Sequence, residues 1–485
     1  MNRCSVRGVA RAVYVAIAVV VVVVAALGYY YVAYVAPAPV KPIKVGYVGD
    51  VGSVGTRPCI ETVRLAAEEI NEAGGILGRP VEVVVGQGKG ETTTSVSEAK
   101  RLIMEEGVLL LMVEGRSEIA LAVMDASAEL FPDYPHIFVV NWAMAHEIAL
   151  KIYKDPQKYG HCFQGGPHEL HYYGTFKILA DEWKAMNVTK VAILWEGLAW
   201  TAAWRPLELG GKKVPGFEWV PDVATFLKDY VGIDVVYQKV TSPKEPNYYP
   251  ILEAIKNAGA ELIFYVSSWF TNVDTFVSQW ATSAARDIYV QLFGGAGAYR
   301  GFWTMTLYKC LGVLAPFLGP LPEEVPDGWP KDRWLPFYEK CMAKGIEISG
   351  NSMTAYGHVY QLKKAVEKVG DTKDIKALIK AFEETEVLTP TGKFAFVKDY
   401  IYPFWHTSAA INIYNDSRLF EPAVGWGAPT NAQWQYDPAK KAPKIVYLAD
   451  VYKHSWDTPE ALRPAIPSPA KTPAELRHMA GWPGY

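Results

Sequence analysis

The strongest indication of the fold is the segment IKVGYVGDVGSVGTRPCIETVRLAAEEINEAGGILGRP, residues 43–80. Residues 43–48 form a short apolar run rich in β-branched side chains, which predicts a buried strand. From residue 59 to residue 73, apolar residues recur at helical spacing while glutamates occupy the opposite face. Gly74 and Gly75 tolerate positive φ, so they predict the end of this helix. The apolar run at residues 81–85 then predicts a second strand, joined to the first by a right-handed crossover.

The same alternation of apolar strands and amphipathic helices continues to residue 293 and is interrupted once, near residues 162–166. Such alternation predicts parallel sheets covered by helices on both faces. We therefore expect an α/β protein with two doubly wound parallel-sheet lobes joined by a multi-strand hinge. The expected segments are an N-terminal anchor or signal and linker (1–42), the first part of lobe 1 (43–163), lobe 2 (164–312), the second part of lobe 1 (313–390), a return to lobe 2 (391–425) and a C-terminal tail rich in Pro and Trp (426–485).

The segment LAAEEINEAGGILGRPVEV, residues 65–83, resembles the first helix and second strand of type I periplasmic substrate-binding proteins. The family is that of the branched-chain amino-acid (leucine/isoleucine/valine) binding proteins of ABC transporters. The residues that carry the resemblance are Ala66-Ala67, Ile70-Asn71, Gly74-Gly75-Ile76 and Gly78. On this stretch alone, an ordinary αβ connection of any α/β protein is the alternative. The resemblance extends over about residues 43–414, and it implies two lobes that close on a small molecule and dock on an ABC permease, without a cofactor and without bond-making.

The N-terminus has the pattern of a membrane segment. Three arginines precede residues 12–35, a run of 24 residues without a charge. A helix of this length measures about 36 Å, enough to cross a hydrocarbon core of about 30 Å. Positive charge before the span favours a cytoplasmic N-terminus. We expect a single-pass N-terminal transmembrane helix in the cell membrane, with the binding domain outside the cytoplasm; a cleaved signal peptide ending near residues 36–38 is the alternative.

Length and composition describe a globular protein of two domains. The chain has 485 residues, half of them hydrophobic, and a net charge of −3, which gives no argument for nucleic-acid binding. Cys310 and Cys341 bracket a proline-rich segment, and they are the best candidate pair for a disulfide on the outer side of a membrane.

In open α/β sheets, ligands bind beyond the carboxyl ends of the strands. Serine and asparagine at these ends offer hydrogen bonds, and tryptophan offers a flat apolar wall. The resemblance implies that Ser117 binds a ligand carboxylate and that Ala143 completes this grip through its backbone. It also implies that Trp200 covers the ligand from the second lobe, with Trp269 near another such aromatic position, although core packing is an equal alternative for any one of 16 Trp. The expected ligand-binding residues are Arg116, Ser117, Asn141, Trp142, Ala143, Trp200, Ser268, Trp269 and Ala296.

One position departs from the family. Its amino-acid binders carry an acidic residue in the last second-lobe loop, where it pairs with the ligand's ammonium group, and here that position is Ala296. A buried ammonium without a partner costs several kcal/mol. Either Glu196 or Asp274 compensates, or the ligand is not an α-amino acid, and we favour the second reading. Arg116 beside Ser117 would suit a carboxylate, and three tryptophans would suit an aromatic solute, a sugar or a cation. The expected solute is an amino acid or a related carboxylate or amide-like molecule.

Signals of enzymatic chemistry are weak, and we expect a protein that is not an enzyme. The glycines at residues 86–90 lack dinucleotide-binding spacing. His161, His168 and His171 with Glu169 do not form a recognisable set of metal ligands, and we interpret these histidines as surface or turn residues. We expect a solute-binding protein of an ABC importer. A membrane-tethered sensor of the same fold, signalling to a separate partner protein, is the alternative.

Overall fold

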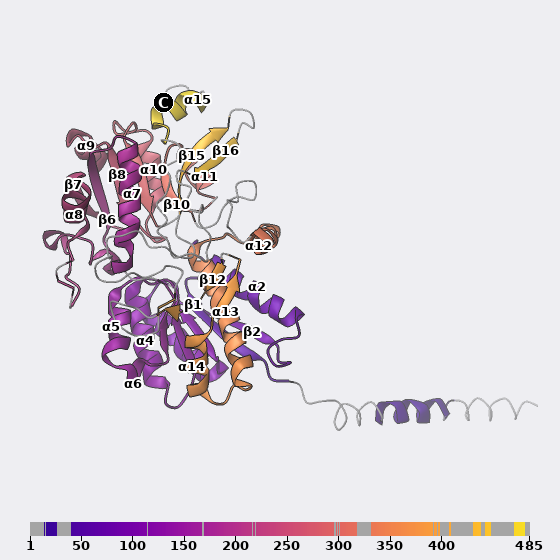
Figure 1. Ribbon diagram of the computed structural model, residues 1–485. Helices are drawn as coiled ribbons and strands as arrows, with labels where there is room; N and C mark the ends of the chain where they lie inside the picture. Colours follow the sequence, from indigo (N-terminus) through magenta and orange to yellow (C-terminus); the bar gives the residue numbers. More distant parts are fainter. Residues whose placement is uncertain are drawn as a thin grey trace, which may run out of the picture.

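The computed structural model describes residues 14, 16–26, 40–113, 115–166, 169–215, 217–218, 220–294, 297, 299, 301–317, 331–390, 392–394, 396–397, 407–408, 430–437, 442–447 and 470–480. These residues form two α/β lobes, which Figure 1 shows one above the other. Each lobe contains a seven-stranded sheet, mostly parallel. The two parallel-sheet lobes confirm the α/β part of the fold class expected from the sequence.

The first sheet has the strand order β13-β14-β5-β4-β3-β1-β2 and is parallel from β14 to β2. Its strands are β1 (Ile43–Gly49), β2 (Val81–Gln87), β3 (Leu110–Val113), β4 (Ile137–Val140), β5 (Cys162–Gln164), β13 (Phe396–Val397) and β14 (Thr407–Ser408). The helices of this lobe are α2 (Thr56–Glu72), α3 (Thr92–Arg101) with the π-helical turn η2 (Leu102–Glu106), α4 (Ser117–Leu130), α5 (His146–Lys154), α6 (Pro156–Tyr159), α12 (Lys331–Ala343), α13 (Gly350–Val369) and α14 (Ile375–Glu384). A separate two-stranded sheet joins β11 (Val387–Thr389) to β12 (Gly392–Phe394).

The second sheet has the order β16-β15-β10-β9-β8-β6-β7 and repeats the first pattern in its parallel part. Its strands are β6 (Lys190–Glu196), β7 (Asp234–Thr241), β8 (Leu262–Val266), β9 (Tyr289–Phe293), β10 (Leu314–Phe317), β15 (Thr430–Asp437) and β16 (Ala442–Tyr447). The helices and helical turns are η3 (Glu169–Tyr172), α7 (Tyr173–Ala185), η4 (Ala199–Thr201), η5 (Leu207–Leu209), α8 (Val223–Phe226), η6 (Leu227–Val231), α9 (Tyr249–Asn257), α10 (Val273–Trp280), α11 (Phe302–Met305) and α15 (Pro473–Ala480).

Both faces of each sheet are buried, because side chains of a strand alternate between two helical layers. In β3, Leu110 and Met112 face the core shared with α2 and α13, while Leu111 and Val113 face the core shared with α3 and α4. The second sheet divides in the same way, with α7 on one face and α9 and α10 on the other. This explains why the strands read as unbroken apolar runs in the sequence.

The chain enters the first lobe through the unit that the sequence identified. Helix α2 buries its apolar face and ends at Ala73, and Gly74 and Gly75 follow with positive φ, as predicted. The Asn71 side chain then binds both backbone groups of Val81, which fixes the helix against the start of β2. On its other side, the Thr62 hydroxyl donates to the Ser352 carbonyl of α13 at 2.8 Å. Chain segments almost 300 residues apart therefore form one layer.

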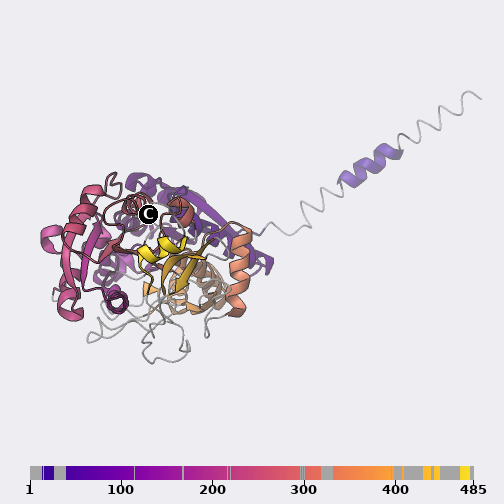
Figure 2. The same ribbon diagram turned by 90° about the horizontal axis from the view of Figure 1, so that it is seen from above.

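Three segments lie elsewhere than expected. Strand β10 belongs to the second sheet, not to lobe 1. It contains Pro316, and because proline is disfavoured in strands, the sequence pattern did not indicate a strand here. Strands β13 and β14 extend the first sheet, although residues 391–425 were expected in lobe 2. In the tail, β15 and β16 add antiparallel strands to the second sheet and α15 covers the same lobe, as the view in Figure 2 shows. The final strand expected at residues 409–414 lies outside the described residues.

The expected disulfide is wrong. Cys310 and Cys341 are free and buried in the cores of different lobes, which keeps their sulfur atoms apart. At the N-terminus, residues 16–26 are helical and exposed, and half of the expected span at residues 12–35 lies outside the described residues. A search of the described residues for a helix with the length and hydropathy of a membrane span found none.

Candidate functional site

The first-lobe part of the candidate site lies where β3 and β4 end. Ser117 begins α4 and is 2% exposed, and its hydroxyl accepts a hydrogen bond from the Ala145 backbone N–H at 3.3 Å. Arg116 precedes it, but its guanidinium donates to the Gly90 carbonyl at 2.7 Å. The arginine is therefore engaged with the loop after β2, while the helix N-terminus at Ser117 provides the positive end of a helix dipole.

Asn141, directly after β4, is completely buried and points into the first lobe. Its amide nitrogen donates to the Tyr47 hydroxyl at 3.2 Å and to the Asn351 carbonyl at 3.1 Å. Its amide oxygen accepts from the Thr354 hydroxyl at 2.7 Å. Donor and acceptor of this side chain thus already have partners on β1 and α13, which assigns Asn141 to the packing of the lobe.

Trp142 and Ala143 follow Asn141. Trp142 adopts a φ of 67°, which is unusual for a residue with a side chain, and it packs on Gly166, where a Cβ would lie 3.0 Å from the Trp142 Cα. The Ala143 carbonyl accepts from the Gln164 side chain at 3.1 Å. This turn therefore connects the end of β4 with the chain that leaves β5 for the second lobe.

The second-lobe part is organised by Glu196, the last residue of β6. Its carboxylate is completely buried and accepts hydrogen bonds from the indole of Trp200 at 2.6 Å, from the Ser268 hydroxyl at 2.7 Å and from the Thr271 hydroxyl. Burial raises the pKa of Glu196 above its ordinary value, although these three donors act in the opposite direction. Two residues expected at the site, Trp200 and Ser268, are thus brought together by this one carboxylate.

Trp269 lies in a contact between the lobes. Its ring stacks on Tyr299 with centroids 4.5 Å apart, and a Cβ on Gly55 of the first lobe would lie 2.8 Å from the Trp269 ring. The Tyr299 hydroxyl donates to the first-lobe carbonyl of Val54 at 2.7 Å. The tryptophan therefore packs on the loop after β1.

A second contact joins the lobes near Ser117. The Ala199 backbone N–H, next to Trp200, donates to the carboxylate of Glu118 on α4 at 3.2 Å. Ser117 and Trp200 are each next to a partner in this bond, so the two contacts bring expected site residues of both lobes near one another. Ala296 lies outside the described residues.

The sequence analysis missed Thr271, Glu118 and Tyr299 as parts of this arrangement. Each of the three lies one to three residues from an expected site residue. Its part in the arrangement depends on a hydrogen bond to a residue far away in the sequence, which local patterns do not reveal. Glu196 had a stronger signal, because an acidic residue directly follows the apolar run of β6. It was considered only as a substitute partner for an ammonium group.

The histidines near the first crossover do not gather as one set. His161 lies in a turn, as expected, but it is 1% exposed, stacks on Phe131 and shares the Ser127 hydroxyl with His136, so it is not a surface residue. Burial lowers the pKa of His136 to about 4. His168 lies outside the described residues, and the side chain of His171 is likewise not described. Glu169 instead faces His146 of α5.

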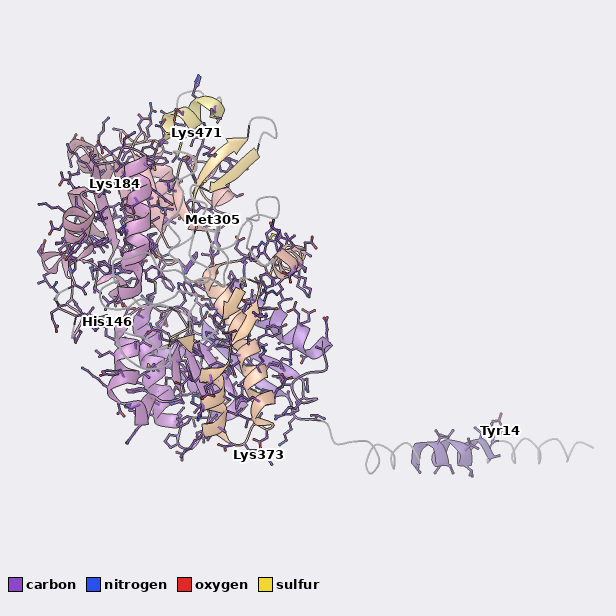
Figure 3. All side chains as sticks on the ribbon, in the orientation of Figure 1. Tyr14, His146, Lys184, Met305, Lys373 and Lys471 are labelled. Atoms are coloured by element: carbon purple, nitrogen blue, oxygen red, sulfur yellow. The ribbon has the colours of Figure 1, made fainter. Side chains whose placement is uncertain are left out.

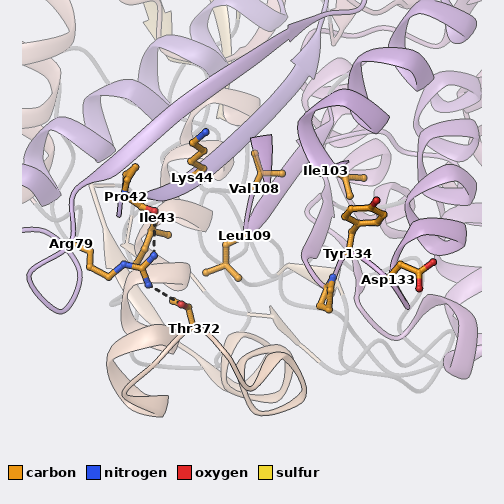
Figure 4. A pocket seen from close by; sticks show the side chains of 12 residues that line it. Pro42, Ile43, Lys44, Arg79, Ile103, Val108, Leu109, Asp133, Tyr134 and Thr372 are labelled. Carbon is orange, nitrogen blue, oxygen red and sulfur yellow. Dashed lines mark hydrogen bonds between the residues drawn. The ribbon is translucent and has the colours of Figure 1, made fainter. Parts of the chain in front are cut away.

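A cavity of about 340 Å³ lies at the opposite edge of the first sheet (Figure 4). It is lined by residues at the amino ends of β1, β3 and β4, and one wall is held by Arg79, which donates to the Thr372 hydroxyl at 2.8 Å. Ligands of open α/β sheets bind at the carboxyl ends of the strands, so this cavity is separate from the candidate site.

Residues 42–203 match a family model described as periplasmic binding protein. Among solved structures, the branched-chain amino acid transporter substrate binding protein of Streptococcus pneumoniae in complex with isoleucine is 17% identical, covers 84% of this chain and 100% of its own, and superposes with a TM-score of 0.59. A solute binding protein of R. palustris in complex with 4-hydroxybenzoate is 17% identical, with 84% and 95% covered and a TM-score of 0.59.

The leucine-, isoleucine-, valine-, threonine- and alanine-binding protein of Brucella ovis in its closed conformation is 14% identical, with 84% and 94% covered and a TM-score of 0.61. At these identities the solved structures show a common fold. A comparison with curated proteins found no match.

Proposed function

We propose that this chain, which has the type I periplasmic-binding-protein fold and matches that family over residues 42–203, captures a small solute between its lobes and delivers it to an ABC importer. The observation that carries the proposal is a hydrogen bond between the lobes beside two expected site residues. Glu118, next to Ser117 at the N-terminus of α4, accepts it from the backbone N–H of Ala199, next to Trp200. Hinge closure of such lobes around a ligand is a common form of conformational change.

The proposed solute carries a carboxylate or an amide-like group. The N-terminus of α4, with Ser117 and the turn at Ala143, offers an environment in which negative charge is stabilised. Opposite it, Glu196 supplies a buried acid whose oxygens already accept three hydrogen bonds. An amino acid and an aromatic carboxylate are the two solute types to compare, since isoleucine and 4-hydroxybenzoate are bound by the relatives above.

We also propose that the N-terminal segment anchors the binding domain in the cell membrane, outside the cytoplasm, and that an ABC permease is the docking partner. The support is the uncharged run at residues 12–35 after three arginines. The alternative of a tethered sensor draws no support from the relatives, whose names describe transport or solute binding.

The test is solute binding by wild type and by two variants of Trp200. Mass spectrometry of co-purified metabolites, followed by calorimetry with isoleucine and 4-hydroxybenzoate, identifies the solute class. Trp200→Ala should weaken solute binding by about 1–3 kcal/mol, as removal of a buried aromatic anchor does. Trp200→Phe keeps the aromatic ring but loses the bond to Glu196, so we expect a smaller loss.

The matched control is Trp183→Phe. Trp183 is completely buried in the core of the second lobe, on α7, and its replacement should lower stability without changing the affinity of the folded protein. Affinity that is equal in wild type and both Trp200 variants, with folding intact, would remove Trp200 from the site. A chain that binds neither solute and co-purifies with no metabolite contradicts solute capture.

A further inference from the structure

Three side chains with metal-binding atoms meet at the first crossover between the lobes. They are His146 and Glu147, at the start of α5, and Glu169, at the start of η3. One ligand atom from each of the three lies within 4.8 Å of the others. Figure 3 labels His146, which lies where the two lobes meet.

The distances suit a tetrahedral ion. The imidazole Nδ1 of His146 is 3.5 Å from a carboxylate oxygen of Glu147 and 3.5 Å from Oε1 of Glu169. A Zn²⁺ ion with bonds of about 2.0–2.1 Å to nitrogen and oxygen separates its tetrahedral ligand atoms by about 3.4 Å. The two distances from His146 therefore match the spacing of tetrahedral ligands, and the third ligand atom lies within 4.8 Å of the others. Three protein ligands leave a fourth position for water.

The imidazole of His146 supplies an independent indication of a ligand. Its side chain is 5% exposed, and among the described residues its Nδ1 makes no hydrogen bond; a protonated ring would form ion pairs with both carboxylates at 3.5 Å. A buried polar atom without a partner costs about 1–3 kcal/mol, and native structures rarely leave one. This nitrogen points toward both carboxylates at a distance longer than a hydrogen bond, which is the arrangement that an ion between them would resolve.

The trio is held in place by the backbone around it. Oε2 of Glu169 accepts the His146 backbone N–H at 2.5 Å, which leaves Oε1 directed at the imidazole. The Glu169 carbonyl accepts from the Trp204 indole at 2.9 Å, and its N–H donates to the Met144 carbonyl at 3.1 Å. Such supporting bonds orient ligands before a metal binds. Lys212 is the positive charge that acts on His146 from the second lobe, and the two carboxylates outnumber it.

We propose that His146, Glu147 and Glu169 form a binding site for a first-row divalent transition-metal ion of the Zn²⁺ type. One imidazole and two carboxylates suit this class, whereas Mg²⁺ prefers an all-oxygen octahedral environment with several waters. The site joins α5 to the segment that enters the second lobe, and Ala149 of the same helix packs in the second-lobe core. A bound ion therefore links elements on both sides of the crossover.

The experiment is Zn²⁺ titration of the tag-free, chelator-treated full chain in competition with a chromophoric Zn²⁺ indicator. Wild type should bind one equivalent of Zn²⁺ and should not bind Mg²⁺ under the same conditions. His146→Ala should weaken Zn²⁺ binding by about tenfold or more, at least as much as loss of a supporting residue does. The control His478→Ala removes an exposed histidine of α15 and should leave binding unchanged.

Glu147→Gln is the second variant, in case His146→Ala does not fold. The Glu147 side chain is 38% exposed, so its replacement by an isosteric amide should preserve the fold while weakening Zn²⁺ binding. The proposal is overturned if wild type binds no Zn²⁺, if Mg²⁺ binds as tightly as Zn²⁺, or if the folded variants of His146 and Glu147 bind Zn²⁺ like wild type. Each measurement is independent of solute binding, so its failure leaves the proposed function untouched.

Discussion

Asn141 and Glu196 invite comparison, because each is a completely buried polar residue at the carboxyl end of a strand. Asn141, in the first lobe, turns inward and binds Tyr47, Asn351 and Thr354 of its own layers. Glu196, in the second lobe, binds Trp200, Ser268 and Thr271, which lie in the loops beyond the strands. Similar places in similar sheets are thus used in one lobe for packing and in the other for arranging the loops of the candidate site.

A position at the end of a strand therefore does not by itself give a residue a role in binding. The role depends on where the side chain finds its hydrogen-bond partners: within the packed layers of the lobe, or in the loops beyond the strand ends. In the first lobe, α13 returns from a distant part of the sequence and supplies Asn351 and Thr354. In the second lobe, the partners of Glu196 come from the loop segments after β6 and β8, so that carboxylate stays at the edge.

The largest effect should come from Asn141→Ala. The variant removes three buried hydrogen bonds, to Tyr47, Asn351 and Thr354, each worth about 1 kcal/mol, so the free energy of unfolding should fall by about 3 kcal/mol. Urea denaturation measures this loss, and calorimetry should find the solute affinity of the folded variant unchanged. Thr354→Val removes the bond to Asn141 and a second bond to the Asn351 carbonyl, so it should cost about 2 kcal/mol. A loss of affinity without a loss of stability would reverse the roles assigned to the two residues.

A smaller effect is expected from Gly55→Ala, which acts on the contact between the lobes. The new methyl group would lie 2.8 Å from the Trp269 ring and force the lobes or the ring to move. Since overpacking costs about 1–3 kcal/mol, solute affinity should fall by about tenfold, with a larger radius of gyration in X-ray scattering.

Gly52→Ala is the matched control for this variant, because its methyl group would meet only Asp50 at an ordinary 3.6 Å. Because the two glycines lie in the same loop, comparing the two variants separates the effect of the contact between the lobes from the effect of changing the loop itself. If Gly55→Ala and Gly52→Ala bind solute equally well and scatter alike, the Trp269 contact does not couple closure to binding.

The smallest effect should be a pH dependence of stability that comes from Glu196, because its carboxyl group ionises and the amide of Asn141 does not. Burial raises the pKa of Glu196 in the folded protein above the ordinary value of 4.5. The folded state therefore holds this proton at pH values where the unfolded chain has lost it, so this contribution to stability declines as pH rises from 4.5 through the raised value. The measurement is the free energy of unfolding of wild type and of Glu196→Gln across this pH range. The stability of wild type relative to the variant should fall as pH rises.

Thr271→Val sharpens this test, because it removes a donor that lowers the pKa of Glu196. We expect the decline to extend to higher pH in that variant. A constant difference between wild type and Glu196→Gln at all pH values would mean that Glu196 titrates alike in the folded and unfolded chain, and its burial would then not govern its ionisation.

Much of the fold could be predicted from local patterns. The unit at residues 43–85 has the expected strand, helix and glycine stop, because apolar period and backbone freedom are properties of neighbouring residues. Strand β10 was not predicted, because Pro316 lowers the local preference for a strand. Pairing with β9 and β15 overrides that preference in the folded protein. In the candidate site, the strand ends were predictable, but the partners of Arg116 and Asn141 were not.

Local patterns were enough to predict two sheets of alternating strands and helices, together with the strand ends at the edge of each sheet. Those features follow from hydrophobic burial on both faces of each sheet, which leaves a period in the sequence. The pairing of Asn141 with Thr354, 213 residues away, the three donors around Glu196 and the approach of Glu169 to His146 depend on how the layers pack. Hydrogen bonds need atoms placed within a few tenths of an ångström, and such placement across long separations arises only once the layers have packed.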